Sequence, residues 1–184
     1  MVAFQRGDPS AFRTLFERHA RSMVAFCHHF VRDAARAEEL AQDVFLKLHH
    51  AAPSYRPSAR FKTFLYRIAS NHCLNELRRG EYGARAAEPH GEAVDLDALP
   101  GSAATPEEEA VGDALGRAVA ELLQRLPERQ RLAFAMCRFQ GLSYEEIAEV
   151  LEVSVPAVKS LIHRATEAAA EALAPFAPDG GEAP

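Results

Sequence analysis

The chain has 184 residues and a mass of 20.2 kDa, which is enough for one ordinary domain or two small ones. Hydrophobic residues make up 48% of it and charged residues 26%, a balance that excludes a fully disordered chain and a fibrous protein. Aromatic residues account for only 8%, without any Trp, whereas Ala, Leu, Glu and Arg are frequent. The composition therefore predicts an all-α fold.

The net charge of −5 hides a very uneven distribution along the chain. Residues 54–85 carry seven basic and two acidic residues, whereas residues 86–116 carry eight acidic residues and no basic one. A basic segment suits a polyanionic partner whatever the total charge, although chance clustering on a solvated surface would explain the same count. The acidic segment also contains three prolines and lacks an apolar period, which is typical of a linker.

These composition changes divide the chain into four parts. We expect a helical domain over residues 1–85, a flexible acidic linker over 86–113, a second helical domain over 114–173 and a disordered tail over 174–184.

Three helices are predicted in the first domain. Apolar residues recur at spacings of three and four from Phe12 to Phe30, from Ala37 to Leu48 and from Phe61 to Ile68. The expected N-caps of these helices are Asp8, Asp33 and Ser58. Together the three apolar stripes provide a compact core.

The third helix has a second, polar face. On a straight helix, Arg60, Arg67, Asn71 and Arg78 fall on one side, and Lys62, Tyr66 and Arg79 flank them. We call these seven residues the basic strip. Cationic and amide groups in a row, with Tyr55 and Phe61 nearby, suit backbone phosphates and unstacked bases. The alternative is that the aromatic residues belong to the core and the arginines are simply solvated.

The second domain carries a more specific pattern. A helix over residues 128–140 is expected to end at Gly141. Ser143 and Glu146 have the spacing of a capping box, which predicts a short helix after Leu142. After a tight turn, Ser154 is expected to cap the next helix, and the outward face of that helix is small, polar or basic.

Two short helices joined by a tight turn are typical of a helix-turn-helix, whose second helix enters the major groove of DNA. A plain helical hairpin is the alternative. Glu152 stands where such turns usually have Gly, and a positive φ at this position would cost about 1–2 kcal/mol.

The sequence does not favour a metal-binding protein or an enzyme. Cys27, Cys73 and Cys137, and the histidine pairs His28-His29 and His49-His50, lack the spacing of metal ligands or of a disulfide framework. The sequence contains no Gly-rich phosphate loop and no nucleophile elbow. We therefore expect no metal, no cofactor and no enzymatic activity. The N-terminus lacks the pattern of a signal peptide and no apolar run could span a bilayer, so a cytoplasmic location is predicted.

Two long segments carry a resemblance to a known family. The segment AEELAQDVFLKLHHAAPSYRPSARFKTFLYRIASNHCLNELRR resembles region 2 of bacterial extracytoplasmic-function (ECF) sigma factors. The segment LLQRLPERQRLAFAMCRFQGLSYEEIAEVLEVSVPAVKSLIHRA resembles their region 4. The likeness covers nearly all of the chain outside the linker and the tail. It implies a sigma region 2 helical bundle and a sigma region 4 helix-turn-helix, joined by the acidic linker.

The resemblance also implies a role for each surface. The second helix would bind the clamp helices of the RNA polymerase β′ subunit, and the region 4 domain would lie on the β flap. The residues for the clamp helices would be Glu39, Leu40, Gln42, Asp43 and Leu46. Those for the −10 element, whose strand is melted and whose base is flipped, would be Tyr55, Arg56, Arg60, Phe61, Lys62, Tyr66, Arg67, Asn71 and Arg78. Those for the duplex −35 element would be Ser154, Val155, Pro156, Ala157, Lys159, Ser160, His163 and Arg164.

Some features limit what the resemblance implies. The family often has Arg where Leu161 and Thr166 stand here, and Pro156 removes a backbone donor near the helix start, so the promoter sequence is not carried over. Family members are commonly inhibited by an anti-sigma protein, which makes such a partner expected here. The rival interpretation is a helix-turn-helix regulator that binds an operator without joining the polymerase, but it leaves the basic strip unexplained.

Overall fold

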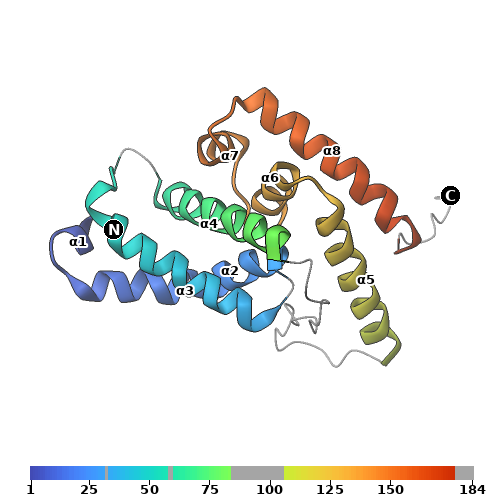
Figure 1. Cartoon of the computed structure of the whole chain (residues 1–184), viewed down its shortest axis with the longest axis horizontal. Coiled ribbons are helices and arrows are strands. Elements are labelled where there is room, and N and C mark those ends of the chain that lie inside the picture. Colours follow the sequence, from blue (N-terminus) through green and yellow to red (C-terminus); the bar gives the residue numbers. More distant parts are fainter. Residues whose placement is uncertain (32, 58–59, 84–105, 177–184) are drawn as a thin grey trace, which may run out of the picture.

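The structure, a computed structural model, describes residues 1–31, 33–57, 60–83 and 106–176 (Figure 1). Every regular element in those ranges is helical. The α-helices are α1 Val2–Gln5, α2 Pro9–Val31, α3 Ala34–Ala51, α4 Phe61–Gly83, α5 Pro106–Arg125, α6 Glu128–Arg138, α7 Tyr144–Leu151 and α8 Val155–Leu173; two short 3-10 helices are η1 Ala52–Ser54 and η2 Ala174–Phe176.

The N-terminal helices α2, α3 and α4 pack into a bundle because each carries an apolar stripe. Asp33 caps α3 as predicted, since its Oδ1 accepts the backbone N–H of Arg36 at 2.7 Å. The predicted stripe of α3 is buried from Ala37 to Leu48. The buried residues of the bundle core are Met23, Phe26, Cys27, Phe30, Ala37, Leu40, Ala41, Val44, Phe45, Leu48, Leu65, Ala69 and Cys73.

The C-terminal helices α5 to α8 also pack together. Leu122, Leu123 and Leu126 of α5 form a cluster with Phe134 of α6 and with Ala165 and Ala169 of α8. The turn between α5 and α6 is held by Arg131, which is 6% exposed. Its guanidinium donates to the backbone carbonyls of Gln124 at 3.0 Å and of Leu126 at 3.3 Å. A buried charge is thereby given hydrogen-bond partners, which burial requires.

Helix α4 joins the two halves of the molecule, because it lies between α2 and α3 on one side and α6 and α7 on the other (Figure 1). The apolar cluster of the N-terminal bundle continues without a break into Met136 of α6, Ile147 of α7 and Val158 of α8. The polar side of α4 therefore faces protein along part of its length.

Several boundaries differ from the sequence prediction. Helix α1 was not predicted. Helix α5 begins at Pro106, inside the segment expected to be linker, because proline is favoured in the first turn of a helix. Residues 174–176 form a 3-10 turn rather than tail. The remaining linker residues 86–105, tail residues 177–184 and Ser58 lie outside the described residues.

None of the helices in the described ranges has the length and apolar character needed to cross a bilayer.

Candidate nucleic-acid interface

The basic strip lies on the side of α4 that faces α6 and α7. Arg60, at the start of α4, pairs with Glu146 of α7 at 3.0 Å. One turn or more further on, Arg67 donates from Nη2 to the backbone carbonyl of Glu149 at 3.4 Å. Near the other end of the strip, Arg78 approaches Glu128 of α6 at 3.9 Å. Three cations of the strip are therefore within reach of C-terminal carboxylates or carbonyls.

The middle of the strip is held by one residue, Gln140, in the turn between α6 and α7. The Tyr66 hydroxyl donates to Gln140 Oε1 at 2.5 Å, and the Lys62 ammonium donates to the Gln140 backbone carbonyl. The Tyr66 ring is 1% exposed and packs edge-on against Phe26, with ring centroids 5.1 Å apart. Burial raises the pKa of Tyr66 to about 12.

Tyr66 was predicted to flank an exposed strip, and this part of the prediction is wrong for the arrangement seen here. Its ring is core and its hydroxyl joins the two halves of the chain. Asn71, by contrast, is exposed as expected. Arg79 turns toward Glu76 of its own helix, at 3.8 Å.

The segment that precedes α4 brings together the predicted aromatic residues. Tyr55 follows η1 and packs edge-on against Phe64, with ring centroids 5.1 Å apart, and more loosely against Phe61 at 6.5 Å. Tyr55 is mostly buried by these contacts, whereas Arg56 is exposed. The described part of this segment thus has a cluster of aromatic rings beside the exposed cation of Arg56, a combination that suits a stacked or flipped base.

The predicted polymerase-binding residues occupy the outer face of α3. Glu39, Gln42, Asp43 and Leu46 are exposed, and Leu46 is a large apolar side chain with 59% exposure. Leu40 does not belong to this face, because it is 0% exposed and packs inside the bundle. The prediction that Leu40 contacts the polymerase is therefore wrong, because the helical periodicity of α3 places Leu40 on the apolar stripe that faces the bundle core.

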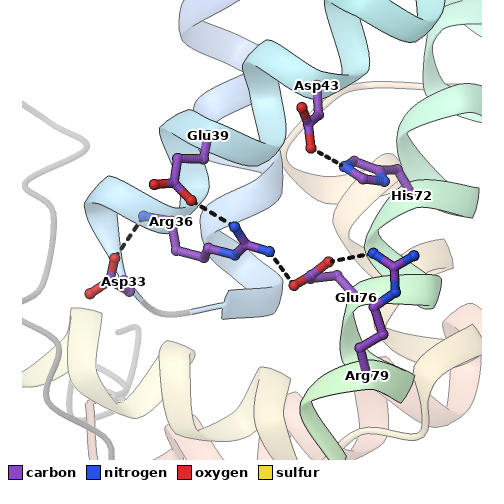
Figure 2. Close-up of polar contacts among 7 residues, drawn as sticks. All are labelled: Asp33, Arg36, Glu39, Asp43, His72, Glu76 and Arg79. Atoms are coloured by element: carbon purple, nitrogen blue, oxygen red, sulfur yellow. Dashed lines mark hydrogen bonds and ion pairs between the residues drawn. The ribbon is translucent and has the colours of Figure 1, made fainter. Parts of the chain in front are cut away.

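A network of charges holds this face of α3 to α4 (Figure 2). Arg36 pairs with Glu39 at 2.6 Å and also with Glu76 of α4. Hydrogen bonds to Glu76 and then Glu39 raise the pKa of Arg36, so the guanidinium stays charged. Further along, His72 Nε2 lies 3.2 Å from Asp43 Oδ2. Two of the exposed carboxylates on α3 are therefore oriented by residues buried or half-buried between the helices.

The helix-turn-helix is built as its sequence predicts. Ser143 and Glu146 form a complete capping box at the start of α7, with hydrogen bonds of 3.2 and 2.8 Å. The Ser143 N–H, followed by Arg60, lowers the pKa of Glu146. Glu152 ends α7 in the left-handed region, with φ of 54°. Ser154 then caps α8, accepting the N–H of Ala157 at 3.4 Å.

The outer face of α8 remains open, whereas Lys62, Tyr66 and Arg67 of the basic strip are bonded to the C-terminal domain. Six of the eight predicted residues are exposed, whereas Val155 and Ala157 are half-buried at the base of the first turn. Lys159, Ser160, His163 and Arg164 line one shallow surface hollow together with Glu167, and His163 Nδ1 lies 3.1 Å from the Glu167 carboxylate. The exposed residues are Ser154, Pro156, Lys159, Ser160, His163 and Arg164.

Two of the three cysteines and His72 lie in packing positions. Cys27 and Cys73 are buried in the bundle core, with their sulfur atoms 4.0 Å apart. His72 is buried beside Asp43. Within the described ranges, no group of three or more His, Cys, Asp or Glu residues is arranged to hold a metal ion.

Comparisons with known proteins now bear on this geometry. The family model "Sigma-70 region 2" matches residues 15–81, and "Sigma-70, region 4" matches residues 116–168. The RNA polymerase sigma-H factor of Pseudomonas aeruginosa is 36% identical over 177 residues, which cover 94% of this chain and 91% of that protein. An ECF sigma factor, the sigma-E factor of Escherichia coli K12, is also similar at 31% identity. The chain belongs to the ECF family of RNA polymerase sigma factors.

One curated relative and two solved structures extend this likeness. The ECF sigma-E factor of Escherichia coli K12 is 31% identical over 169 residues, covering 89% of this sigma factor and 87% of the relative. Two solved structures share the fold, each with a TM-score of 0.68. One is CnrH in complex with the cytosolic domain of CnrY, at 24% identity and covering 95% of this chain and 94% of that one. The other is RpoE with the anti-sigma factor NepR from Bartonella quintana, at 22% identity and covering 89% and 97%.

Sequence reasoning missed the residues that join the two halves of this sigma factor. Gln140 and Phe139 follow α6 and carry no motif, although Phe139 stacks on His29 of α2 with ring centroids 4.4 Å apart. The long-range pairs of Arg60 and Arg67 were equally hidden, because residues 82 to 86 positions apart meet only in the folded chain. The one available hint was the apolar Phe139 between Arg138 and Gln140.

The stacking of His29 on Phe139 predicts a pH dependence. Burial, and secondarily the charge of His28, lowers the pKa of His29 to about 4, whereas an unfolded chain protonates histidine near 6.5. The stability that neutral His29 contributes is therefore complete above about pH 6.5. It is lost as the pH falls toward 4, at up to about 1.4 kcal/mol per pH unit. The measurement is urea unfolding between pH 7.5 and 4.5 for the wild type and the His29→Phe variant, and parallel profiles would contradict the assignment.

Proposed function

We propose that this sigma factor reads promoter DNA with two separate surfaces, the outer face of α8 for duplex −35 DNA and the basic strip with residues 55–61 for the opened −10 strand. The observation that carries the proposal is the open, cationic face of α8 at the end of a fully capped helix-turn-helix. A helix presented in this way fits the major groove of B-DNA.

The roles of individual residues on α8 follow from their chemistry. Lys159 and Arg164 are exposed cations without an acidic partner among the described ion pairs, so they are suited to phosphates. Ser154, Pro156 and Ser160 lie near the N-terminal end of the helix, where side chains reach base edges. His163 adds a donor or acceptor whose state depends on pH.

The −10 surface requires a change of arrangement. Lys62 and Tyr66 are bonded to the turn before α7, and Arg60 and Arg67 to α7 itself, so the opened strand would compete with these partners for the same groups. We infer that the C-terminal helices leave α4 when the sigma factor joins the polymerase. Phosphates then replace Glu146 and Glu128 as partners of the strip.

The outer face of α3 is proposed to bind the β′ clamp helices of core polymerase, with the C-terminal domain on the β flap. Leu46 supplies an apolar anchor, and Glu39, Gln42 and Asp43 surround it with polar groups. Arg36 and His72 hold two of these carboxylates in place (Figure 2), which reduces the ordering cost of binding. Because its partner is the cytoplasmic polymerase, which carries out the chemistry, we propose that the protein is cytoplasmic and has no catalytic activity of its own.

An anti-sigma protein is proposed as a further partner. One of the two structures that share this fold is a sigma factor bound to its anti-sigma factor. The domain boundaries at residues 85 and 173 also remain proposals, since the matched regions end at 81 and 168.

The α3 face is tested by a pair of leucines one and a half turns apart. Leu46→Ala is expected to weaken binding to core polymerase about tenfold or more, because an exposed apolar anchor is removed, and to change the free energy of unfolding by less than about 0.5 kcal/mol. Leu40→Ala is expected to lower that free energy by about 2–5 kcal/mol, because a buried side chain is removed. Core polymerase titration and chemical unfolding of both variants measure the two effects. Equal polymerase affinity for Leu46→Ala and the wild type would refute the assignment.

The α8 face is tested by the salt dependence of promoter binding. Replacing Lys159 and Arg164 by Ala removes two proposed phosphate contacts, so the slope of log K against log salt should become shallower by about 2. Reconstituted holoenzyme on duplex −35 DNA provides the measurement. The matched control removes two exposed cations of α2, Arg13 and Arg21, and should keep the wild-type slope. An unchanged slope in the α8 variant would show that this face does not dock on DNA.

A further inference from the structure

The segment proposed to hold the flipped −10 base begins at Tyr55, whose backbone is bound by the side chain of Gln5. The carboxamide of Gln5 donates from Nε2 to two backbone carbonyls, that of Ala52 at 2.6 Å and that of Tyr55 at 2.9 Å. These carbonyls stand at the first residue of η1 and just beyond its last. The backbone N–H of Tyr55 donates to the Ala52 carbonyl as well, at 3.1 Å. One amide group therefore spans the whole turn.

Helix α1 is itself fixed against the end of α3, so Gln5 is held where it can reach the turn. Phe4 packs against Phe12 of α2 and His49 of α3, with ring centroids 5.0 Å away in both cases. Phe12 and His49 complete the trio at 5.2 Å. Gly7, with φ of 92°, lets the chain reverse between α1 and α2, a conformation that side chains other than Gly rarely adopt.

The turn of residues 52–55 determines the position of Tyr55. Its ring lies against Phe64 of α4, and its carbonyl is one of the two that Gln5 holds. Tyr55 is thus fixed through both its ring and its backbone carbonyl, just after η1. Fixing a segment before it binds lowers the conformational entropy lost on binding, which strengthens recognition without a new contact.

We propose that Gln5 is a positioning residue for the −10 base: it never touches DNA and acts by holding the turn of residues 52–55. The proposal rests on the proposed function of residues 55–61. Its chemistry is specific, because binding two carbonyls requires a group with two donor hydrogens. A carboxylate of the same length has only acceptors and would face both carbonyl oxygens.

The test uses variants of equal or similar length. Q5M keeps the shape and removes both donors, Q5E replaces them by a charged acceptor, and Q5K restores a donor. Each full-length variant is assembled with core polymerase on a promoter found by start-site mapping, with 2-aminopurine substituted in turn for each base of the −10 element. Fluorescence then reports the unstacking of the base. Q130M on α6 is the matched control, because Gln130 lies outside the proposed −10 and −35 residues.

The expected result is a loss of at least fivefold in the equilibrium constant for base unstacking with Q5M, a larger loss with Q5E, and substantial recovery with Q5K. Core polymerase affinity, −35 duplex binding and the unfolding midpoint should stay close to those of the wild type and of Q130M.

Three outcomes would overturn the proposal, and they are distinguishable. Wild-type unstacking by Q5M would show that the turn needs no clamp. A parallel fall in polymerase affinity, duplex binding and stability would show that Gln5 is only structural. Absence of an unstacking signal in the wild type itself would instead remove the proposed function of residues 55–61, and the role of Gln5 with it.

Discussion

The packing of Tyr66 between two halves of the chain is the contact on which the arrangement of this sigma factor depends. Its ring lies edge-on to Phe26 in the N-terminal bundle, and its hydroxyl donates to Gln140 in the C-terminal domain. Because a buried hydroxyl needs a partner, the hydrogen bond to Gln140 favours keeping the C-terminal domain close while the ring is covered. The cations on either side of Tyr66 then find their own partners in α7 and the adjoining turn.

The two proposed DNA-binding surfaces are consequently in different states in one molecule. The outer face of α8 is open, whereas Lys62 and Tyr66 of the basic strip are bonded to the C-terminal domain and Arg60 is paired with it. The ion pairs at the edge of the contact are weak, since the Arg60 side chain is 80% exposed in its pair with Glu146 and such pairs contribute about 0–1 kcal/mol. The apolar cluster beneath them, with Met136 and Ile147, resists separation more strongly. Opening therefore needs a partner that binds both domains, a role that core polymerase fits.

Local patterns predicted much of this structure, because local chemistry determines caps and stripes. The caps at Asp33, Ser143 and Ser154 were predicted and are confirmed, and Glu152, which stands where such turns usually have Gly, has a positive φ. Leu40 shows where a role implied by family resemblance fails. Its position on the apolar stripe buries it, so it cannot be a surface contact. Three sets of contacts were beyond prediction: the bonds between the basic strip and the C-terminal domain, those of Gln5 to the turn of residues 52–55, and the stacking of Phe139 on His29. Each joins residues that lie 47 or more positions apart, and neither helical periodicity nor capping records such contacts.

The central claim is that the strip on α4 is exchanged between the C-terminal domain and DNA. The most direct measurement is energy transfer between fluorophores on α2 and α8, attached at Arg21→Cys and Glu171→Cys in a Cys137→Ser background, which leaves the buried Cys27 and Cys73 unlabelled. The account predicts efficient transfer in the free protein and a clear fall when core polymerase binds. The same transfer efficiency in the free and polymerase-bound protein would contradict it.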